Sequence, residues 1–193
     1  MARDPGAQWQ HRQPTRYVVL RDGDAALQAR AALGRAARRA WQQKADVDGY
    51  RSGSGAAGDS AKARMAAAMQ HYVDHFHEVP VMVLVCLMRY REPNAYEGAS
   101  VYPAVQNLLL AARGLGLGGA VTLWQLLVED ELRVILGIPA EVAMSACVTL
   151  GHAAGHHGPV RRRPLRDVVF DGAWDSPAAW AADPPGTAFT GRK

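Results

Sequence analysis

Three consecutive arginines, Arg161, Arg162 and Arg163, form the strongest candidate anion site in the sequence. A guanidinium group binds phosphate through two parallel hydrogen bonds and keeps its charge at neutral pH. Alternate side chains of an extended segment point to opposite sides, so we expect Arg161 and Arg163 to share a face and Arg162 to point away. Taken alone, such a run is typical of a solvated charged segment as well as of a phosphate site.

A second candidate is the glycine-rich segment after an apolar stretch. Nucleotide-binding glycine loops follow a strand and open a helix, whereas these glycines come after a predicted helix, which disfavours a Rossmann or P-loop site. Gly114 can end the helix in the left-handed conformation, and Gly116, Gly118 and Gly119 let the main chain pass close to a flat or crowded neighbour. Two interpretations stay open: a helix cap with close packing, or a backbone that lies against a ligand.

Histidines gather in two places at spacings that metal ligands use. They are His71, His75 and His77 in one segment, and His152, His156 and His157 in the other. Neither group has the His-Glu-x-x-His pattern, so we expect no bound metal. Paired carboxylates and Ser/His/Asp arrangements are also absent at persuasive spacings. The sequence therefore favours chemistry that belongs to a cofactor, which the protein binds and orients.

The elements that must position these residues are predicted from periodicity and from glycine and proline. Strands are expected at 15–20, 79–88, 142–150 and 165–170, and helices at 24–44, 61–76 and 130–136, with a further helix that has Pro103 in its first turn. Residues 45–60 are expected to form a mobile loop and 171–193 an extended C-terminal arm. The predicted fold is α+β: a single domain, 1–193, with a central sheet and helices packed over it.

The helix that contains Pro103 has few polar positions. Its apolar residues recur at helical spacing and include Val105, Leu108, Leu109, Ala112 and Leu115. This pattern predicts a helix buried on nearly all sides. We expect a second copy of the chain to bury part of it, with Trp174, Trp180 and Phe189 of the arm as anchors on the neighbour. The alternative is a helix buried within one subunit and a tail without a partner.

Bulk properties narrow the class of protein further. The chain of 193 residues has a formal net charge of +4 and two cysteines, Cys86 and Cys147, both within apolar runs. No apolar run reaches the roughly 18–20 residues of a membrane span, and the N-terminus has no apolar signal core. Basic residues are not interleaved with aromatic ones as in nucleic-acid-binding modules. We expect a cytoplasmic protein that binds neither membrane nor nucleic acid.

Four segments, in this order, resemble the FMN-dependent nitroreductase family. They are Arg12-Gln13-Pro14 before a strand, His77-Glu78-Val79-Pro80-Val81, the stretch from Pro103 to Thr122, and Arg161 to Pro164. The His-Glu-Val-Pro-Val strand entry is typical of one branch of this family. The resemblance runs from about Gln8 to Trp174. It implies a central, mostly antiparallel sheet flanked by helices, and a homodimer that binds FMN at its interface.

The resemblance also implies roles for particular residues. The loop residues Gln10, His11, Arg12 and Gln13 and the backbone of Val121, Thr122 and Leu123 would lie against the flavin, with an N–H directed toward its N5 atom. Arg161 and Arg163 would hold the FMN phosphate. NAD(P)H would supply hydride, and a nitroaromatic, a quinone or a related small molecule would accept the electrons.

The N-terminal region departs from the family pattern. Family members usually carry an additional Arg-rich segment that touches the FMN phosphate, and this sequence starts inside the loop that follows it. Trp9 and His11 stand where small residues and an asparagine are usual. We therefore keep a second hypothesis, an N-terminally reduced relative that serves as a flavin-binding or non-catalytic module.

Overall fold

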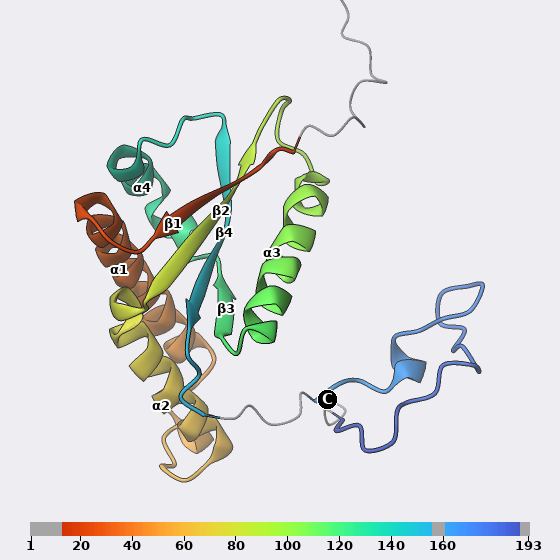
Figure 1. Ribbon diagram of the computed structural model, residues 1–193. Helices are drawn as coiled ribbons and strands as arrows, with labels where there is room; N and C mark the ends of the chain where they lie inside the picture. Colours follow the sequence, from red (N-terminus) through yellow and green to blue (C-terminus); the bar gives the residue numbers. More distant parts are fainter. Residues whose placement is uncertain (1–12, 156–160, 190–193) are drawn as a thin grey trace, which may run out of the picture. The chain divides into compact units, whose positions relative to one another are not determined.

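The computed structural model describes residues 13–155 and 161–189 of the chain. The chain divides into two compact units, Met1–Ala153 and Ala154–Lys193, and each is described by itself (Figure 1). In the first unit, helices lie on both faces of one sheet, which confirms the α+β fold class. The single domain expected over 1–193 stays a prediction. Within the described ranges, no helix is both long and apolar enough to cross a membrane.

The sheet has four antiparallel strands in the order β1-β2-β4-β3. They are β1 (Thr15–Leu20), β2 (Val81–Met88), β3 (Gly118–Thr122) and β4 (Val142–Gly151). β1, β2 and β4 were expected from their β-branched and apolar runs and are confirmed. The edge strand β3 was not expected, because Gly118 and Gly119 were interpreted as part of a turn.

β4 carries a bulge at Ser145. Val85 of β2 pairs with Ala146 and Cys86 pairs with Met144, so Ser145 has no partner on β2. Bulges bend a strand and re-aim its side chains, and they are frequent beside active sites. This bulge lies in the wall of the cleft described below.

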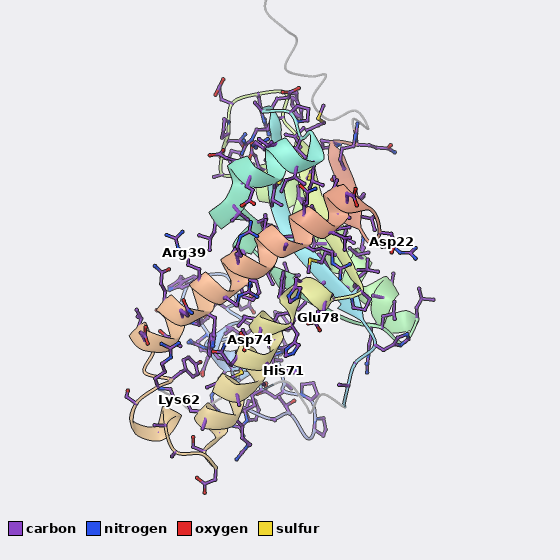
Figure 2. The ribbon with its side chains drawn as sticks, turned by 90° about the vertical axis from the view of Figure 1, so that its left-hand side faces the viewer. Asp22, Arg39, Lys62, His71, Asp74 and Glu78 are labelled. Atoms are coloured by element: carbon purple, nitrogen blue, oxygen red, sulfur yellow. The ribbon has the colours of Figure 1, made fainter. Side chains whose placement is uncertain are left out.

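One face of the sheet is covered by several helical elements (Figure 1). They are α1 (Asp24–Val47), α2 (Ala61–Asp74), α4 (Glu129–Leu136) and the 3-10 helices η3 (Phe76–Glu78) and η4 (Trp124–Val128). Figure 2 looks onto these helices, with His71 and Asp74 marking α2. Their core includes Met82 and Leu84 from β2, packed with Leu33, Phe76 and Leu132. Because successive strand residues alternate between faces, only every second residue of β2 enters this core.

Among the described residues of the first unit, one helix covers the opposite face, α3 (Glu97–Gly114). Its core is smaller and is made by Val101 and Val105 of α3 with residues such as Val83, Val85 and Val148. The prediction of burial on nearly all sides is wrong for the single chain. Tyr102 is 49% exposed, Leu110 59% and Leu115 78%. A helix that packs on a sheet with one side only leaves its other side open.

Details at the ends of α3 also differ from expectation. The helix begins at Glu97, so Pro103 lies in its second turn rather than its first. Gly114 is the last helical residue, and the left-handed conformation belongs to Gly116, with φ of 78°. The glycine cap is thus displaced by two residues, because Leu115 still bonds back to Ala111 and Ala112.

Other boundaries needed correction too. The expected loop at 45–60 contains the end of α1 and a 3-10 helix, η2 (Gly53–Gly55). The helix expected to reach Phe76 ends at Asp74 and continues as η3. The strand expected at 165–170 is wrong, because Leu165–Asp167 forms the 3-10 helix η5 after Pro164.

The second unit is held by isolated contacts. Arg162 and Phe189 form a parallel β-bridge, and Phe170 and Pro177 an antiparallel one. The Asp183 carboxylate accepts a hydrogen bond from the Leu165 N–H at 3.0 Å. Trp174 and Trp180 are 84% and 70% exposed, respectively. Their expected contact with a second copy stays a prediction.

Candidate functional site

A cleft of about 430 Å³ opens in the first unit where β3 ends. β3 pairs with β4 only from Cys147 to Gly151, so the preceding residues of β4 have no neighbouring strand on that side within the described sheet. The cleft is lined by Arg89, Ala95, Glu97, Gly98, Tyr102, Leu123, Leu126, Glu129, Ala143, Met144 and Ser145. Its volume falls within the range of small-molecule and cofactor sites, about 300–1,000 Å³.

A charged pair forms one wall of this cleft. Arg89 donates from Nε to Glu97 Oε1 at 2.8 Å and from Nη2 to Oε2 at 2.9 Å. The two side chains are only 29% and 20% exposed. The hydrogen bonds lower the pKa of Glu97 and raise that of Arg89, so both groups are charged at neutral pH. This pair joins the end of β2 to the first turn of α3 and gives the cleft a fixed polar edge.

Apolar side chains, Glu129 and two residues with hydroxyl groups, Tyr102 and Ser145, complete the cleft. Leu123 and Leu126 are about half exposed, at 49% and 53%. Ser145, the bulged residue of β4, lines the cleft together with its neighbour Met144. Such a mixture of apolar surface and polar edge suits a planar heteroaromatic ring, which presents an apolar face and a polar rim.

The segment predicted to face the flavin borders this cleft. Val121 is 43% exposed on the edge strand, and Leu123 lies in the lining. Thr122, in contrast, is buried, and its hydroxyl donates to the Cys147 carbonyl at 3.5 Å. Thr122 could therefore serve a ligand only through its backbone.

The surroundings of Gly119 show why a glycine stands at this position. A Cβ at this position would lie 2.8 Å from Leu109 Cδ2, 3.0 Å from Leu150 Cδ2 and 3.1 Å from the Thr149 carbonyl oxygen. The crowded neighbours are therefore α3 and β4 of the same chain. Close packing between α3 and β3 accounts for this glycine without a ligand.

Gln13 lies at the same end of the sheet as the cleft. The carbonyl of the next residue, Pro14, accepts a hydrogen bond from the Met88 N–H at 2.8 Å, directly before Arg89 of the cleft wall. Thr15 then donates its hydroxyl to the Ser100 carbonyl of α3 at 3.2 Å. Gln13 is exposed and has φ of 44°, an uncommon conformation for a residue other than glycine. The other three loop residues, Gln10, His11 and Arg12, lie outside the described residues.

The predicted phosphate-binding arginines belong to the second unit. Arg161 and Arg163 are exposed. The backbone N–H of Arg162, between them, donates to the Ala188 carbonyl at 2.8 Å. Their role as a phosphate clamp stays a prediction.

Several groups of this site were missed by the sequence analysis. Arg89 and Glu97 stand eight residues apart across a strand end and a helix start, a spacing that no common motif marks. Ser145 looked like one more residue of a regular strand. Gln125 does not line the cleft but precedes the lining residue Leu126; it is fully buried and donates from Nε2 to the Met144 carbonyl at 3.2 Å, and its Oε1 has no partner in the described part of the chain. None of the four has a sequence signal that could have singled it out.

Other candidate chemistry is weaker. Burial raises the pKa of Cys86 to about 11 and that of Cys147 to about 12, so neither thiol is an activated nucleophile. The rings of His71 and His75 lie 4.2 Å apart. Among the described residues, however, no group of three metal-ligating side chains forms.

The chain matches a family model and several solved structures. The family model described as the Nitroreductase family matches residues 7–152. A protein assigned as a nitroreductase from Desulfovibrio desulfuricans, solved in complex with FMN, is 23% identical with a TM-score of 0.55, over 83% of this chain and 73% of that one.

Two more solved structures have the same fold. The FMN- and NADPH-dependent nitroreductase NfnB from Sphigopyxis sp. strain HMH is 18% identical with a TM-score of 0.52, over 83% of this chain and 81% of that one. The FMN-dependent nitroreductase NfnB from Mycobacterium smegmatis, in complex with NADPH, is 17% identical with a TM-score of 0.51, over 74% and 70%. At these identities the likeness concerns the fold.

Proposed function

Because the chain belongs to the nitroreductase family, we propose that it is an oxidoreductase that binds FMN, accepts hydride from NAD(P)H and reduces a small-molecule acceptor such as a nitroaromatic or a quinone. The family match and the FMN- and NADPH-dependent neighbours support this function. The observation that carries it is the cleft at the end of β3, which is bordered by Leu123 and lies at the same end of the sheet as Gln13.

The residues present fit a flavin ring in this cleft. The volume is sufficient, Leu123 and Leu126 provide apolar surface, and the Arg89–Glu97 pair and Ser145 provide polar groups. When bound, FMN supplies reversible transfer of two electrons. In this proposal the backbone of Val121, Thr122 and Leu123 orients the ring, and Gln10, His11, Arg12 and Gln13 border it.

The phosphate is proposed to be held by Arg161 and Arg163. Each charged hydrogen bond contributes about 1.5–3 kcal/mol, so replacing both residues with Ala should weaken FMN binding at least about tenfold. Riboflavin, which lacks the phosphate, should bind about equally to both proteins. Arg162→Ala is the matched control and should have the smaller effect. Equal losses for FMN and riboflavin would show that the arginines do not bind phosphate.

We also propose a homodimer in the cytoplasm. The open side of α3, with Tyr102, Leu110 and Leu115 exposed, supports a second copy as its cover. Removing apolar surface from water contributes about 25 cal/mol per Å², enough over a large interface to hold two subunits together.

The decisive experiment reconstitutes the purified protein with FMN and records its visible spectrum and its turnover of NADPH and NADH. We expect a bound-flavin spectrum and oxidation of the nicotinamide with a quinone or nitroaromatic, faster than with the same concentration of free FMN. Bound FMN without turnover would instead support the non-catalytic module. Absence of bound flavin at excess FMN would overturn the proposed enzyme and leave the non-catalytic module, which turnover of the nicotinamide above the rate of free FMN would exclude.

A further inference from the structure

We propose that Tyr72 of α2, acting with Thr149 of β4, is a positioning residue that fixes the backbone of residues 120–124. This inference rests on the proposed function, because Val121 to Leu123 is the segment proposed to orient the flavin. Tyr72 is not among the residues that line the cleft. Its hydroxyl and its ring act instead on the two ends of residues 120–124.

The hydroxyl of Tyr72 reaches the first end. Its oxygen lies 2.8 Å from Thr149 Oγ1, which in turn donates to the Ala120 carbonyl at 3.4 Å. Since the single Thr149 hydroxyl proton is directed to Ala120, Tyr72 donates to Thr149. The result is a chain of two hydrogen bonds from α2 through β4 to the edge strand β3, and such chains strengthen each member.

The ring of Tyr72 reaches the second end. Its centroid lies 6.0 Å from the Trp124 ring and 5.3 Å from the Phe76 ring. Phe76 and Trp124 are themselves 5.0 Å apart at 69°, close to an edge-to-face arrangement. Aromatic pairs in this geometry contribute stabilisation beyond that from the burial of their surface. Trp124 follows directly after Leu123, so this cluster anchors the chain where the proposed flavin segment ends.

Because Thr149 is buried, water cannot readily replace the hydrogen bonds that join Tyr72, Thr149 and Ala120. Thr149 is 4% exposed, and burial raises the pKa of Tyr72, so its hydroxyl stays protonated and able to donate. A buried hydroxyl that loses its partner keeps its desolvation cost. Tyr72 and Thr149 therefore hold β3 in one register, although β3 is a short edge strand with two glycines.

The test compares Tyr72→Phe and Thr149→Val with the wild-type protein. Tyr50→Phe is the matched control, because Tyr50 also packs against a tryptophan, Trp41 at 5.2 Å, on the turn after α1. The first measurement is amide hydrogen exchange of the apo-protein. We expect faster exchange in residues 118–124 of both variants, with the rest of the unit and the Tyr50→Phe control unchanged.

The second measurement is the affinity for FMN and for riboflavin. A displaced ring-facing segment should weaken both ligands by the same factor, about fivefold to tenfold, unlike the loss at Arg161 and Arg163, which is selective for FMN. The double variant should lose no more than Thr149→Val, since both substitutions break one chain.

The two outcomes are separable from the proposed function. If wild-type protein binds no flavin, the proposed function fails, and the exchange measurement alone decides whether Tyr72 positions the segment. Uniformly faster exchange over the whole unit would show a general structural role and overturn the inference. Unchanged exchange in residues 118–124, or unchanged affinity for both flavins in a protein that binds FMN, would overturn it as well.

Discussion

The two faces of the sheet use the same strands and are covered in different ways. On one face, three helices and two 3-10 helices close over residues such as Phe76 and Leu132, which are fully buried. On the other face, α3 is the one helix of the described part of this unit that packs against the sheet, and it leaves Leu110 59% exposed. The first face therefore holds the main stabilising core of the first unit. The second leaves apolar surface and the cleft open for a partner or a ligand.

The largest effect is expected in the first core. Phe76→Ala removes a side chain with no exposure and its ring contacts to Tyr72 and Trp124. We expect a loss of about 3–5 kcal/mol in the free energy of unfolding, from lost burial and the cavity left behind. Urea unfolding followed by circular dichroism measures it. A loss below about 1 kcal/mol would contradict the assignment of the main core to this face.

On the α3 face, Gly119→Ala should lower the free energy of unfolding by about 1–3 kcal/mol, because the added methyl group meets Leu109, Leu150 and the Thr149 backbone. The control is Gly118→Ala, where the nearest atom to the new Cβ is 3.5 Å away. The same unfolding experiment should place the control within about 0.5 kcal/mol of wild type. Equal costs at both positions would remove the evidence for close packing of α3 on β3.

The charged pair at the cleft predicts a pH dependence. The Arg89 hydrogen bonds lower the pKa of Glu97, so their stabilisation is present above the unfolded pKa of about 4.3 and is lost as pH falls through the lower folded value. Between about pH 6 and pH 3, wild type should lose about 1 kcal/mol more stability than Glu97→Gln. Parallel curves for the two proteins would show that the pair contributes no net stability.

The smallest effect on the subunit is expected at Leu110. Leu110→Lys changes an exposed side chain, so the unfolding free energy at dilutions where the protein is monomeric should change by less than about 0.5 kcal/mol. Light scattering at micromolar concentration should instead show a wild-type dimer and a variant monomer. A variant that remains dimeric would place the proposed interface elsewhere.

The sequence analysis predicted the elements whose apolar residues form clear runs or repeats. β1, β2 and β4 carry apolar runs that only a sheet explains, and α4 ends at Gly137 with φ of 63°, as its glycine indicated. β3 was not predicted, because a strand that begins with two glycines shows no alternation of apolar and polar side chains. Its place is set by pairing with β4 and by α3, which are contacts distant in sequence.

The candidate site could be predicted only in part. Leu123 and Gln13 were named from a resemblance, and the structure places both at the cleft end of the sheet. Arg89 and Glu97 could not be found, because their pairing depends on where β2 ends and α3 begins. Thr122 was named only for its backbone, and its buried hydroxyl, which donates to the Cys147 carbonyl, leaves only that backbone to face a ligand.

The bulge at Ser145 separates the cleft wall from both cores of the sheet. Val142 and Met144 before it and Cys147 after it all enter the core under α1, whereas Ala143, Ala146 and Val148 enter the core under α3. With Ser145 deleted, the two sets would alternate without interruption along a regular ladder. Ser145 is thus the extra residue of the bulge and belongs to neither core, so its side chain can serve the cleft wall while the other residues of β4 keep their faces.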